Sequence, residues 1–411
     1  MRNTLLVIGY HWPEPDSTAA GVRMMQLLEV FLNDGYAITF VSTATASEHS
    51  ADLHALNIQT QQIELNNSSF DTFVTILNPK LVLFDRFLTE EQFGWRVVEH
   101  CPNALRILDT EDLHSLRHVR EQAFKKDIPF TIHAWLQNDR TKREIASIYR
   151  CDLSLIISSY EMELLQEVVK IDKNLLLHLP FMVDEQDMAI DLPTFQERSD
   201  FIYVGGGKHS PNIDAIKWLK TEIWPKIREA LPKAKLNIYG AYLPQQINEM
   251  QDPKTGFHVR GRAKTAKEVL LVSRVCLAPL RFGAGIKGKL LHAMQFGLPS
   301  ITTKIGAEGM HDELDWNGTI TDNTVDFAKA AVQLYTNSDT WTNAQKQGMK
   351  ILNTIYSKSI LKKILLKKIK TLQDTIIEHR NQNFIGSMLR HQTLNSTKFM
   401  AKWIAEKNNR I

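Results

Sequence analysis

The sequence predicts an α/β protein built from two successive doubly wound domains, followed by a helical extension. Three observations lead to this prediction. Short apolar runs alternate with helical stretches, the alternation lapses once and resumes, and the last part of the chain reads as helix only. A chain of 411 residues also has room for two domains. We place the domains at residues 1–195 and 196–357 and the extension at 358–411.

The first domain opens with a strand, a loop, a helix and a second strand. Residues 5–8 form an apolar run typical of a buried parallel strand, and residues 22–33 have helical spacing. Gly35 suits the position after a helix end, and residues 37–42 form the next strand. Further strands are predicted at 80–84, 104–108, 151–157 and 175–179. Polar residues follow most of these strands at the sheet edge where such folds bind ligands.

An irregular, acidic stretch between residues 180 and 200 separates this series from a second one, and we interpret it as a linker. The second domain has strands predicted at 201–204, 236–239, 257–259, 275–280 and 300–302. Beyond about residue 345 the pattern predicts helices to the end of the chain.

Composition excludes several classes of protein. Lys and Arg total 49 against 46 for Asp and Glu, so the net charge is +3, which does not favour a dedicated nucleic-acid binder. The three cysteines are far apart and form no CxxC motif, so we expect neither a disulfide scaffold nor a zinc ribbon. No apolar run is long enough for a signal peptide or a membrane span, and a cytoplasmic protein is expected.

The segment with the strongest chemical signal follows the strand at 275–280. Gly283, Gly285 and Gly288 precede a predicted helix, and Lys287 and Lys289 stand at the start of that helix. Glycines let backbone N–H groups approach an anion, and a helix start favours negative charge. Lysines would be unfavourable there without an anion. The combination favours a phosphate site over a simple tight turn, although it is not a Walker A loop.

Residues 279–300 and 302–310, with the glycine loop and helix at 204–219, resemble the donor-binding region of GT-B glycosyltransferases of group 1. The closest likeness is to retaining enzymes of bacterial polysaccharide biosynthesis. The resemblance implies two Rossmann-like domains that face a cleft. It also implies transfer of a sugar from a UDP- or GDP-linked donor to a glycan or lipid-linked acceptor, with no metal and no other cofactor.

The resemblance also assigns site residues. Donor binding falls to Gly206, Lys208, His209, Arg281, Gly283, Gly285, Lys287, His292 and Glu308. Lys287 is expected to stabilise the departing diphosphate as well. Two glutamates usual in such enzymes are replaced here by Ala284 and His292, and Glu308 could supply a carboxylate instead.

In the first domain, the segment after the strand at 104–108 is rich in charged residues and histidines. By resemblance, His114 contacts the transferred sugar with Asp112 beside it, and Gly21 and Arg23 lie on the acceptor side. Two other interpretations stay open. The segment could bind a metal, although its spacing matches no standard site. Asp112 could also simply cap a helix that leaves Arg117 and Arg120 in solvent.

The extension is strongly basic. Residues 358–411 hold 12 Lys and Arg against 3 Asp and Glu, a net charge of +9, which leaves −6 for the rest of the chain. Apolar residues at 361, 364, 365, 369 and 372 share one helix face. This helix could cross back onto the first domain, as in similar enzymes, lie peripherally on an anionic membrane, or be solvated.

Three alternatives to a glycosyltransferase remain at this point. A sugar-nucleotide epimerase or a phosphorylase could use the same fold. The replacement of both glutamates also leaves room for a non-catalytic nucleotide-sugar-binding protein.

Overall fold

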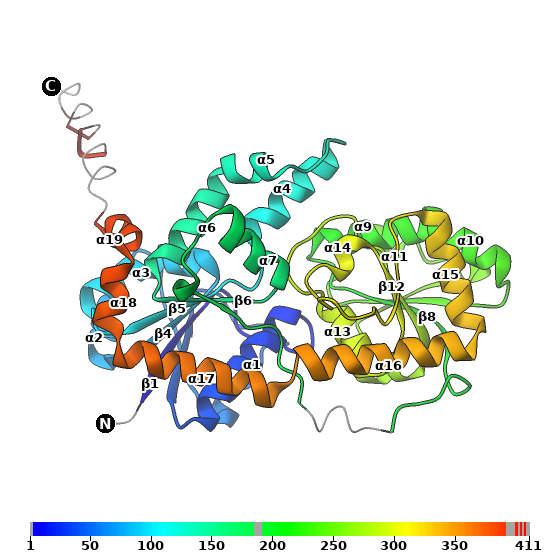
Figure 1. Ribbon diagram of the computed structural model, residues 1–411, viewed down its shortest axis with the longest axis horizontal. Coiled ribbons are helices and arrows are strands. Elements are labelled where there is room, and N and C mark those ends of the chain that lie inside the picture. Colours follow the sequence, from blue (N-terminus) through cyan, green and yellow to red (C-terminus); the bar gives the residue numbers. More distant parts are fainter. Residues whose placement is uncertain (1–2, 185–190, 392–398, 402, 405–406, 408–411) are drawn as a thin grey trace.

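The computed structural model describes residues 3–184, 191–391, 399–401, 403–404 and 407. The chain forms two α/β domains side by side, each a parallel sheet covered by helices on both faces (Figure 1). The predicted fold class is confirmed, and every predicted strand is present. The acidic linker falls partly on residues 185–190, which lie outside the described residues.

The first sheet has seven parallel strands in the order β3-β2-β1-β4-β5-β6-β7. Their bounds are Thr4–Gly9 (β1), Ala37–Ser42 (β2), Gln59–Gln62 (β3), Leu81–Asp85 (β4), Leu105–Asp109 (β5), Leu153–Ile156 (β6) and Leu176–His178 (β7). The sequence Gln-Thr-Gln-Gln of β3 has no apolar residue because this strand lies at the sheet edge. For that reason hydrophobic patterning did not predict it.

The second sheet has six parallel strands in the order β10-β9-β8-β11-β12-β13. Their bounds are Ser199–Val204 (β8), Leu236–Tyr239 (β9), Phe257–Gly261 (β10), Ser273–Ala278 (β11), Ser300–Thr302 (β12) and Gly318–Ile320 (β13). The three-residue β13 is too short for a sequence pattern to reveal. In both sheets the strand order reverses beside the first strand, at β1/β4 and β8/β11, and ligands bind beyond such points.

The helices flank the two sheets. In the first domain they are α1 (Ala19–Asn33), α2 (Ser69–Leu77), α3 (Arg86–His100), α4 (His114–Lys125), α5 (Ile132–Gln137), α6 (Asp139–Arg150) and α7 (Ser159–Glu163). In the second they are α9 (Ser210–Trp218), α10 (Trp224–Ala230), α11 (Gln245–Asn248), α12 (Ala266–Val272), α13 (Gly288–Gln295), α14 (Lys304–Ala307), α15 (Thr324–Thr336) and α16 (Ser338–Ile355). Three more follow: α17 (Lys358–Asp374), α18 (Ile376–Gln382) and α19 (Phe384–Arg390).

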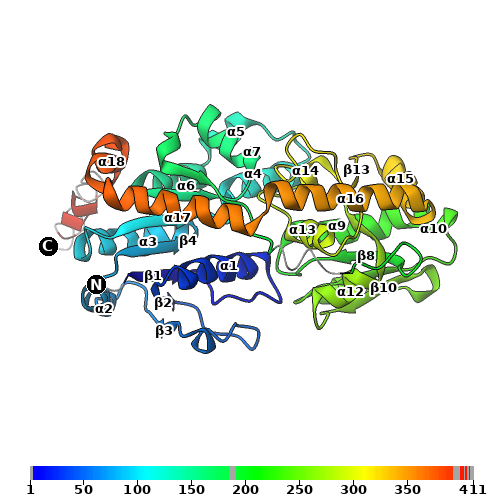
Figure 2. The same ribbon diagram turned by 60° about the horizontal axis from the view of Figure 1, so that its bottom comes forward.

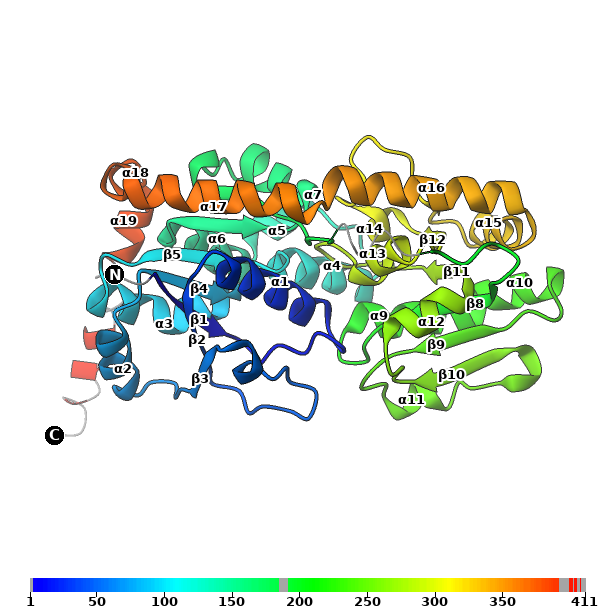
Figure 3. The same ribbon diagram turned by 90° about the horizontal axis from the view of Figure 1, so that it is seen from below.

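Helix α17 belongs to the first domain, although α16 directly before it lies on the second (Figures 2 and 3). Leu361, Leu365, Ile369 and Leu372 are buried in the core that α1 and the first sheet share. The helix thus crosses back onto the first domain and uses most of its apolar face inside the protein, although Ile364, predicted on the same face, is exposed. Peripheral contact of its lysines with a membrane stays a prediction. No helix among the described residues is long and apolar enough to cross a membrane.

Charged contacts fix α18 and α19 at the far end of the first domain. The Arg380 guanidinium donates to Asp152 Oδ2 at 2.8 Å, and Arg106 donates to Oδ1 of the same carboxylate at 2.9 Å. Burial opposes ionisation of Asp152, but the two guanidinium groups hold its pKa well below the usual range.

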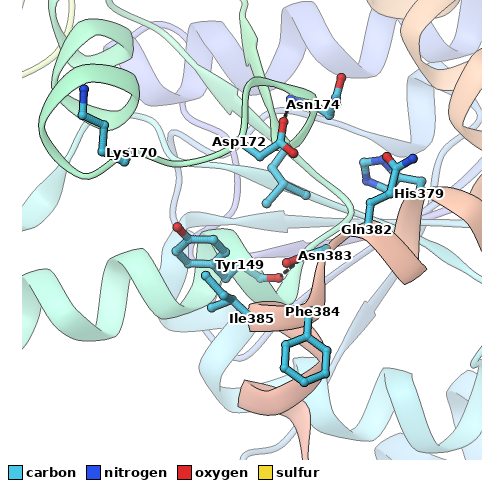
Figure 4. A pocket seen from close by; sticks show the side chains of 10 residues that line it. Tyr149, Lys170, Asp172, Asn174, His379, Gln382, Asn383, Phe384 and Ile385 are labelled. Atoms are coloured by element: carbon cyan, nitrogen blue, oxygen red, sulfur yellow. Dashed lines mark hydrogen bonds between the residues drawn. The ribbon is translucent and has the colours of Figure 1, made fainter.

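A pocket lies where α18 and α19 meet α6, and Asn383 Nδ2 donates to the Tyr149 carbonyl beside it (Figure 4). It is remote from the second domain (Figure 1).

The chain passes between the domains twice, and the two crossings lie side by side. The Val183 N–H donates to the Tyr356 carbonyl at 2.7 Å, and the Lys358 N–H donates to the Val183 carbonyl at 3.0 Å. Because both connections run through one place, relative movement of the domains would bend the chain there.

Candidate active site

Loops at the carboxyl ends of both sheets meet between the domains, and most predicted site residues lie on them (Figure 1). The first domain contributes residues 10–19, 109–114 and 158–161, and the second contributes 205–209, 281–288 and 306–312. The contacts below show that the two sets touch directly. The sequence-predicted donor and acceptor sides therefore form one continuous site.

The glycine loop between β11 and α13 has a shape that only glycine adopts easily. Gly283 and Gly285 have φ values of 154° and 64°. A β-carbon at position 285 would lie 2.7 Å from Asp112 Cβ of the first domain. The loop can therefore approach the opposite domain this closely only with glycine there.

Lys287 ends this loop and is buried. Its ammonium group donates to the Gly285 carbonyl at 2.7 Å, and its backbone takes the N-cap position of α13. Burial lowers the pKa of Lys287 to about 8, although the Glu308 carboxylate opposes the shift. The N-terminus of α13 and this ammonium group together create a region of positive electrostatic potential where the two domains meet.

Lys289, by contrast, supports the second-domain entry loop from behind. It donates to Tyr203 Oη at 2.9 Å and to Asn212 Oδ1. Asn212 Nδ2 in turn donates to the Gly206 carbonyl at 2.9 Å, which holds the loop after β8 in place. Asn212 itself lies in the first turn of α9, whose N-cap position is taken by His209.

The other predicted donor-side cations surround the entry loop. Lys208 is exposed, with its ammonium 3.6 Å from the centre of the Tyr242 ring. His209 lies at the domain border, where its Nε2 is 3.4 Å from Arg117 Nη1 of the first domain. Arg281 forms an ion pair with Asp214 at 2.6 Å and lies over the Phe124 ring of α4.

Glu308 meets an unexpected partner. Arg120 of α4 donates to its two carboxylate oxygens at 2.6 and 2.8 Å and to the Gly283 carbonyl at 2.9 Å. The interpretation that leaves Arg120 in solvent is wrong, since this side chain is buried between the domains. Nothing in the sequence near Arg120 indicates a partner that lies so far along the chain.

Asp112 and His114 form the first domain's part of the site. His114 Nε2 lies 3.3 Å from Asp112 Oδ1, and Arg117 donates to the other oxygen. Burial lowers the pKa of His114 to about 3, more than Asp112 offsets, so the ring is neutral at pH 7. Asp112 does not cap α4, because Leu113 occupies the N-cap position.

The start of α4 is capped instead by two glutamates from elsewhere in the chain. Glu144 of α6 accepts the N–H groups of His114 and Ser115 at 2.8 and 3.0 Å and the Ser115 hydroxyl at 2.6 Å. Glu161 of α7 accepts the Leu113 N–H at 3.1 Å. Sequence analysis did not assign either residue to this role, because each glutamate is distant in sequence from the amides that it binds.

Arg23 and Gly21, predicted on the acceptor side, support the site from beneath. The fully buried Arg23 donates to both oxygens of Asp109 at 2.7 to 3.0 Å and to the Leu179 carbonyl at 2.7 Å. It holds the end of β5 and presents no charge to the cleft. A β-carbon at Gly21 would lie 2.4 Å from the Glu14 carbonyl carbon, so this glycine lets the first loop fold against α1.

The two positions where glutamates are replaced differ in their surroundings. Ala284 packs against the first domain's core, and His292 is half-buried on α13. Burial lowers the pKa of His292. Within the described residues, no group of three or more His, Cys, Asp or Glu side chains is arranged to hold a metal ion.

Comparisons with known proteins bear on the family of the second domain and on the fold of the chain. Residues 198–337 match the family described as Glycosyl transferases group 1. Among solved structures, sucrose-phosphate synthase of Thermosynechococcus elongatus is 15% identical with a TM-score of 0.69, covering 90% of this chain and 99% of its own. WaaG, a glycosyltransferase of lipopolysaccharide biosynthesis, is 12% identical with a TM-score of 0.63, covering 88% and 98%.

A third structure, Anabaena HepE in complex with UDP and glucose, is 8% identical with a TM-score of 0.66, covering 90% of this chain and all of its own. No protein of curated function matches the chain. The solved structures share the GT-B architecture, and the matched family model covers the domain that holds the glycine loop. Residues 198–337 are therefore similar in sequence to group 1 glycosyltransferases, and the chain as a whole has the GT-B fold.

Proposed function

We propose that the enzyme transfers a hexose from a UDP- or GDP-linked donor to a hydroxyl group of a glycan or lipid-linked acceptor, with retention and without a metal. The observation that carries the proposal is the buried Lys287, which donates to the carbonyl of Gly285 at the point where the glycine loop packs against Asp112 of the first domain. The donor sits on the second domain and the acceptor on the first. The complex of HepE with UDP and glucose supports this class of donor.

The donor diphosphate is the leaving group. As the bond from the sugar C1 to the phosphate oxygen breaks, its electron pair stays on the diphosphate. Lys287 and the start of α13 stabilise that charge, and a cation shielded from water does so more strongly than an exposed one. Lys208, His209 and Arg281 lie at the rim for further contacts.

The first domain orients the sugar. The neutral His114 ring offers a hydrogen bond to a sugar hydroxyl, and Asp112 holds the ring in place. The acceptor hydroxyl attacks C1 and passes its proton to the departing phosphate oxygen. No side chain then needs to accept this proton as a base. This is consistent with the carboxylates around the site, which are already ion-paired with arginines.

Thermal stabilisation by a panel of UDP- and GDP-sugars tests the donor, because a ligand that binds only the native state raises the apparent stability. We expect at least one of them to stabilise the enzyme, and released nucleotide diphosphate to accumulate once an acceptor is supplied. NMR of the product reports the anomeric configuration. Binding without any release would instead favour a non-catalytic nucleotide-sugar-binding protein.

A further inference from the structure

Glu161 connects the two halves of the site. Its side chain is fully buried, and one oxygen accepts both the Leu113 N–H at 3.1 Å and the Gly285 N–H at 2.8 Å. Leu113 stands between Asp112 and His114 of the first domain. Gly285 lies in the glycine loop of the second. One carboxyl group thus joins the two segments that the proposed transfer uses.

We propose that Glu161 is a positioning residue, which docks the glycine loop onto the first domain when the cleft closes and so brings Lys287 opposite Asp112 and His114. The proposal rests on the proposed function. Glu161 acts through the backbone that it binds and needs no contact with the sugar.

A second contact holds the same loop. Arg120 donates to the Gly283 carbonyl at 2.9 Å, while Glu161 accepts from Gly285 two residues later. The loop is therefore held through both a carbonyl and an N–H group by side chains of the opposite domain. These two contacts together fix both the position and the orientation of the glycine loop relative to the first domain. Group transfer is sensitive to displacements of about 1 Å between the reacting groups.

We expect the contact with Gly285 to form only in the closed arrangement, because Glu161 and Gly285 belong to opposite domains. Opening at the paired crossings near Val183 would keep the bond from Glu161 to Leu113 and break the one to Gly285. In the open arrangement water can satisfy the Gly285 N–H. Removal of the carboxyl group would leave this N–H buried and unpaired in the closed form alone, so closure is what should weaken.

Three charged groups interact with Glu161: Asp112 and Arg120 from the first domain, and Lys287 from the second. Burial raises the pKa of Glu161 to about 8, and Asp112 adds to the shift. The second domain adds burial, which raises this pKa, and also the Gly285 N–H and Lys287, which lower it. Burial is the largest of these contributions, so we expect closure to take up a proton. We expect closure to weaken as the pH rises from the ordinary carboxyl range through about 8. A glutamine offers the same carbonyl oxygen to both N–H groups at every pH.

The test measures closure without substrate, by energy transfer between dyes at Glu99→Cys on α3 and Glu229→Cys on α10. The native cysteines are all buried, so the introduced thiols should label selectively. We compare Glu161→Ala and Glu161→Gln. Ser159→Ala is the matched control, because it removes another contact between the domains, the exposed 2.8 Å bond to Asp312.

We expect Glu161→Ala to shift the distance distribution toward open forms and to lower kcat about tenfold or more, with the donor KM changed less. Glu161→Gln should close as the parent does and lose the pH dependence of closure. Ser159→Ala should leave the distance distribution and its pH dependence as in the parent. Unchanged closure in Glu161→Ala, or the same pH dependence in Glu161→Gln, would overturn the proposal. If no nucleotide-sugar binds the parent enzyme, the proposed function is wrong, but the closure measurement still tests the proposed role of Glu161.

Discussion

The two sides of the cleft are built in different ways. The second domain's side comes mostly from one continuous segment, in which the glycines at 283 and 285 and Lys287 follow a single strand. The first domain's side depends on buried charged side chains from separate elements, such as Arg23 on Asp109 and Glu144 on α4. The comparison shows that a site formed by the backbone of one segment can be predicted from a short sequence motif. A site held together by contacts between buried charged side chains cannot, because those side chains come from elements far apart in the sequence.

The same difference predicts where substitutions act. On the first domain's side a lost partner leaves a buried charge, so stability should fall. On the second domain's side the lysine and the helix start face the ligand, so binding should fall with little change in stability. The predictions below follow from this contrast, starting with the largest effect.

Asp109→Asn should have the largest effect, because it removes the charge that compensates the fully buried Arg23. Breaking such a pair costs about 3–5 kcal/mol in the free energy of unfolding, which urea denaturation can measure. Asp139→Asn is the matched control, since its ion pair with Lys142 is exposed, and it should leave stability unchanged. Equal stabilities for both variants would contradict the buried pair.

Leu365→Ala tests whether α17 belongs to the first domain. The side chain is fully buried in that domain's core, and its truncation should lower the free energy of unfolding by about 2–5 kcal/mol. The neighbouring Ile364 is exposed, so Ile364→Ala should change stability far less. If Leu365→Ala proves as stable as Ile364→Ala, the helix is only a loose extension.

Lys287→Ala should act on binding. We expect the affinity for UDP or GDP to fall about tenfold to a hundredfold, since hydrogen bonds to charged groups contribute about 1.5–3 kcal/mol. Calorimetric titration gives the affinity, and a thermal melt should show little change. Lys254→Ala, an exposed lysine of the same domain, provides the control. Undiminished nucleotide affinity in Lys287→Ala would place the phosphates elsewhere.

Glu111→Gln should have the smallest effect, visible only as a change in pH dependence. Burial raises the pKa of Glu111 to about 8, and Asp109 adds to the shift. A carboxyl group whose pKa is raised by folding stabilises the protein fully below the unfolded value, and this contribution is lost as the pH rises through about 8. The variant should lose less stability than the parent between pH 5 and 8. Parallel pH profiles of the two proteins would refute this.

Much of the fold could be predicted because parallel strands buried on both faces are continuous apolar runs. The polar strand β3 has no such run, and its position depends on pairing with β2. In the site, Lys287, Asp112 and His114 could be found because they follow strands or glycines. The contacts of Arg120 and Glu161 could not, since their partners Glu308 and Gly285 come from the opposite domain.

Asn212 shows the same limit on a smaller scale. Asn is typical of helix N-caps, yet this residue lies inside α9, and its side chain contacts Lys289 and the Gly206 carbonyl instead. The extension was ambiguous for a related reason. Its apolar face fits a protein core and a membrane equally well, and the packing of Leu361 and Leu365 onto the first domain decides between them. Contact of its exposed lysines with a membrane stays a prediction.

Hydrogen–deuterium exchange with and without the nucleotide diphosphate that binds tests the central claim, that one site spans both domains. We predict slower exchange in two segments at once, residues 283–289 of the second domain and 110–117 of the first. Protection confined to the second domain would contradict the account, because the nucleotide would then bind without bringing Asp112 and His114 to the donor.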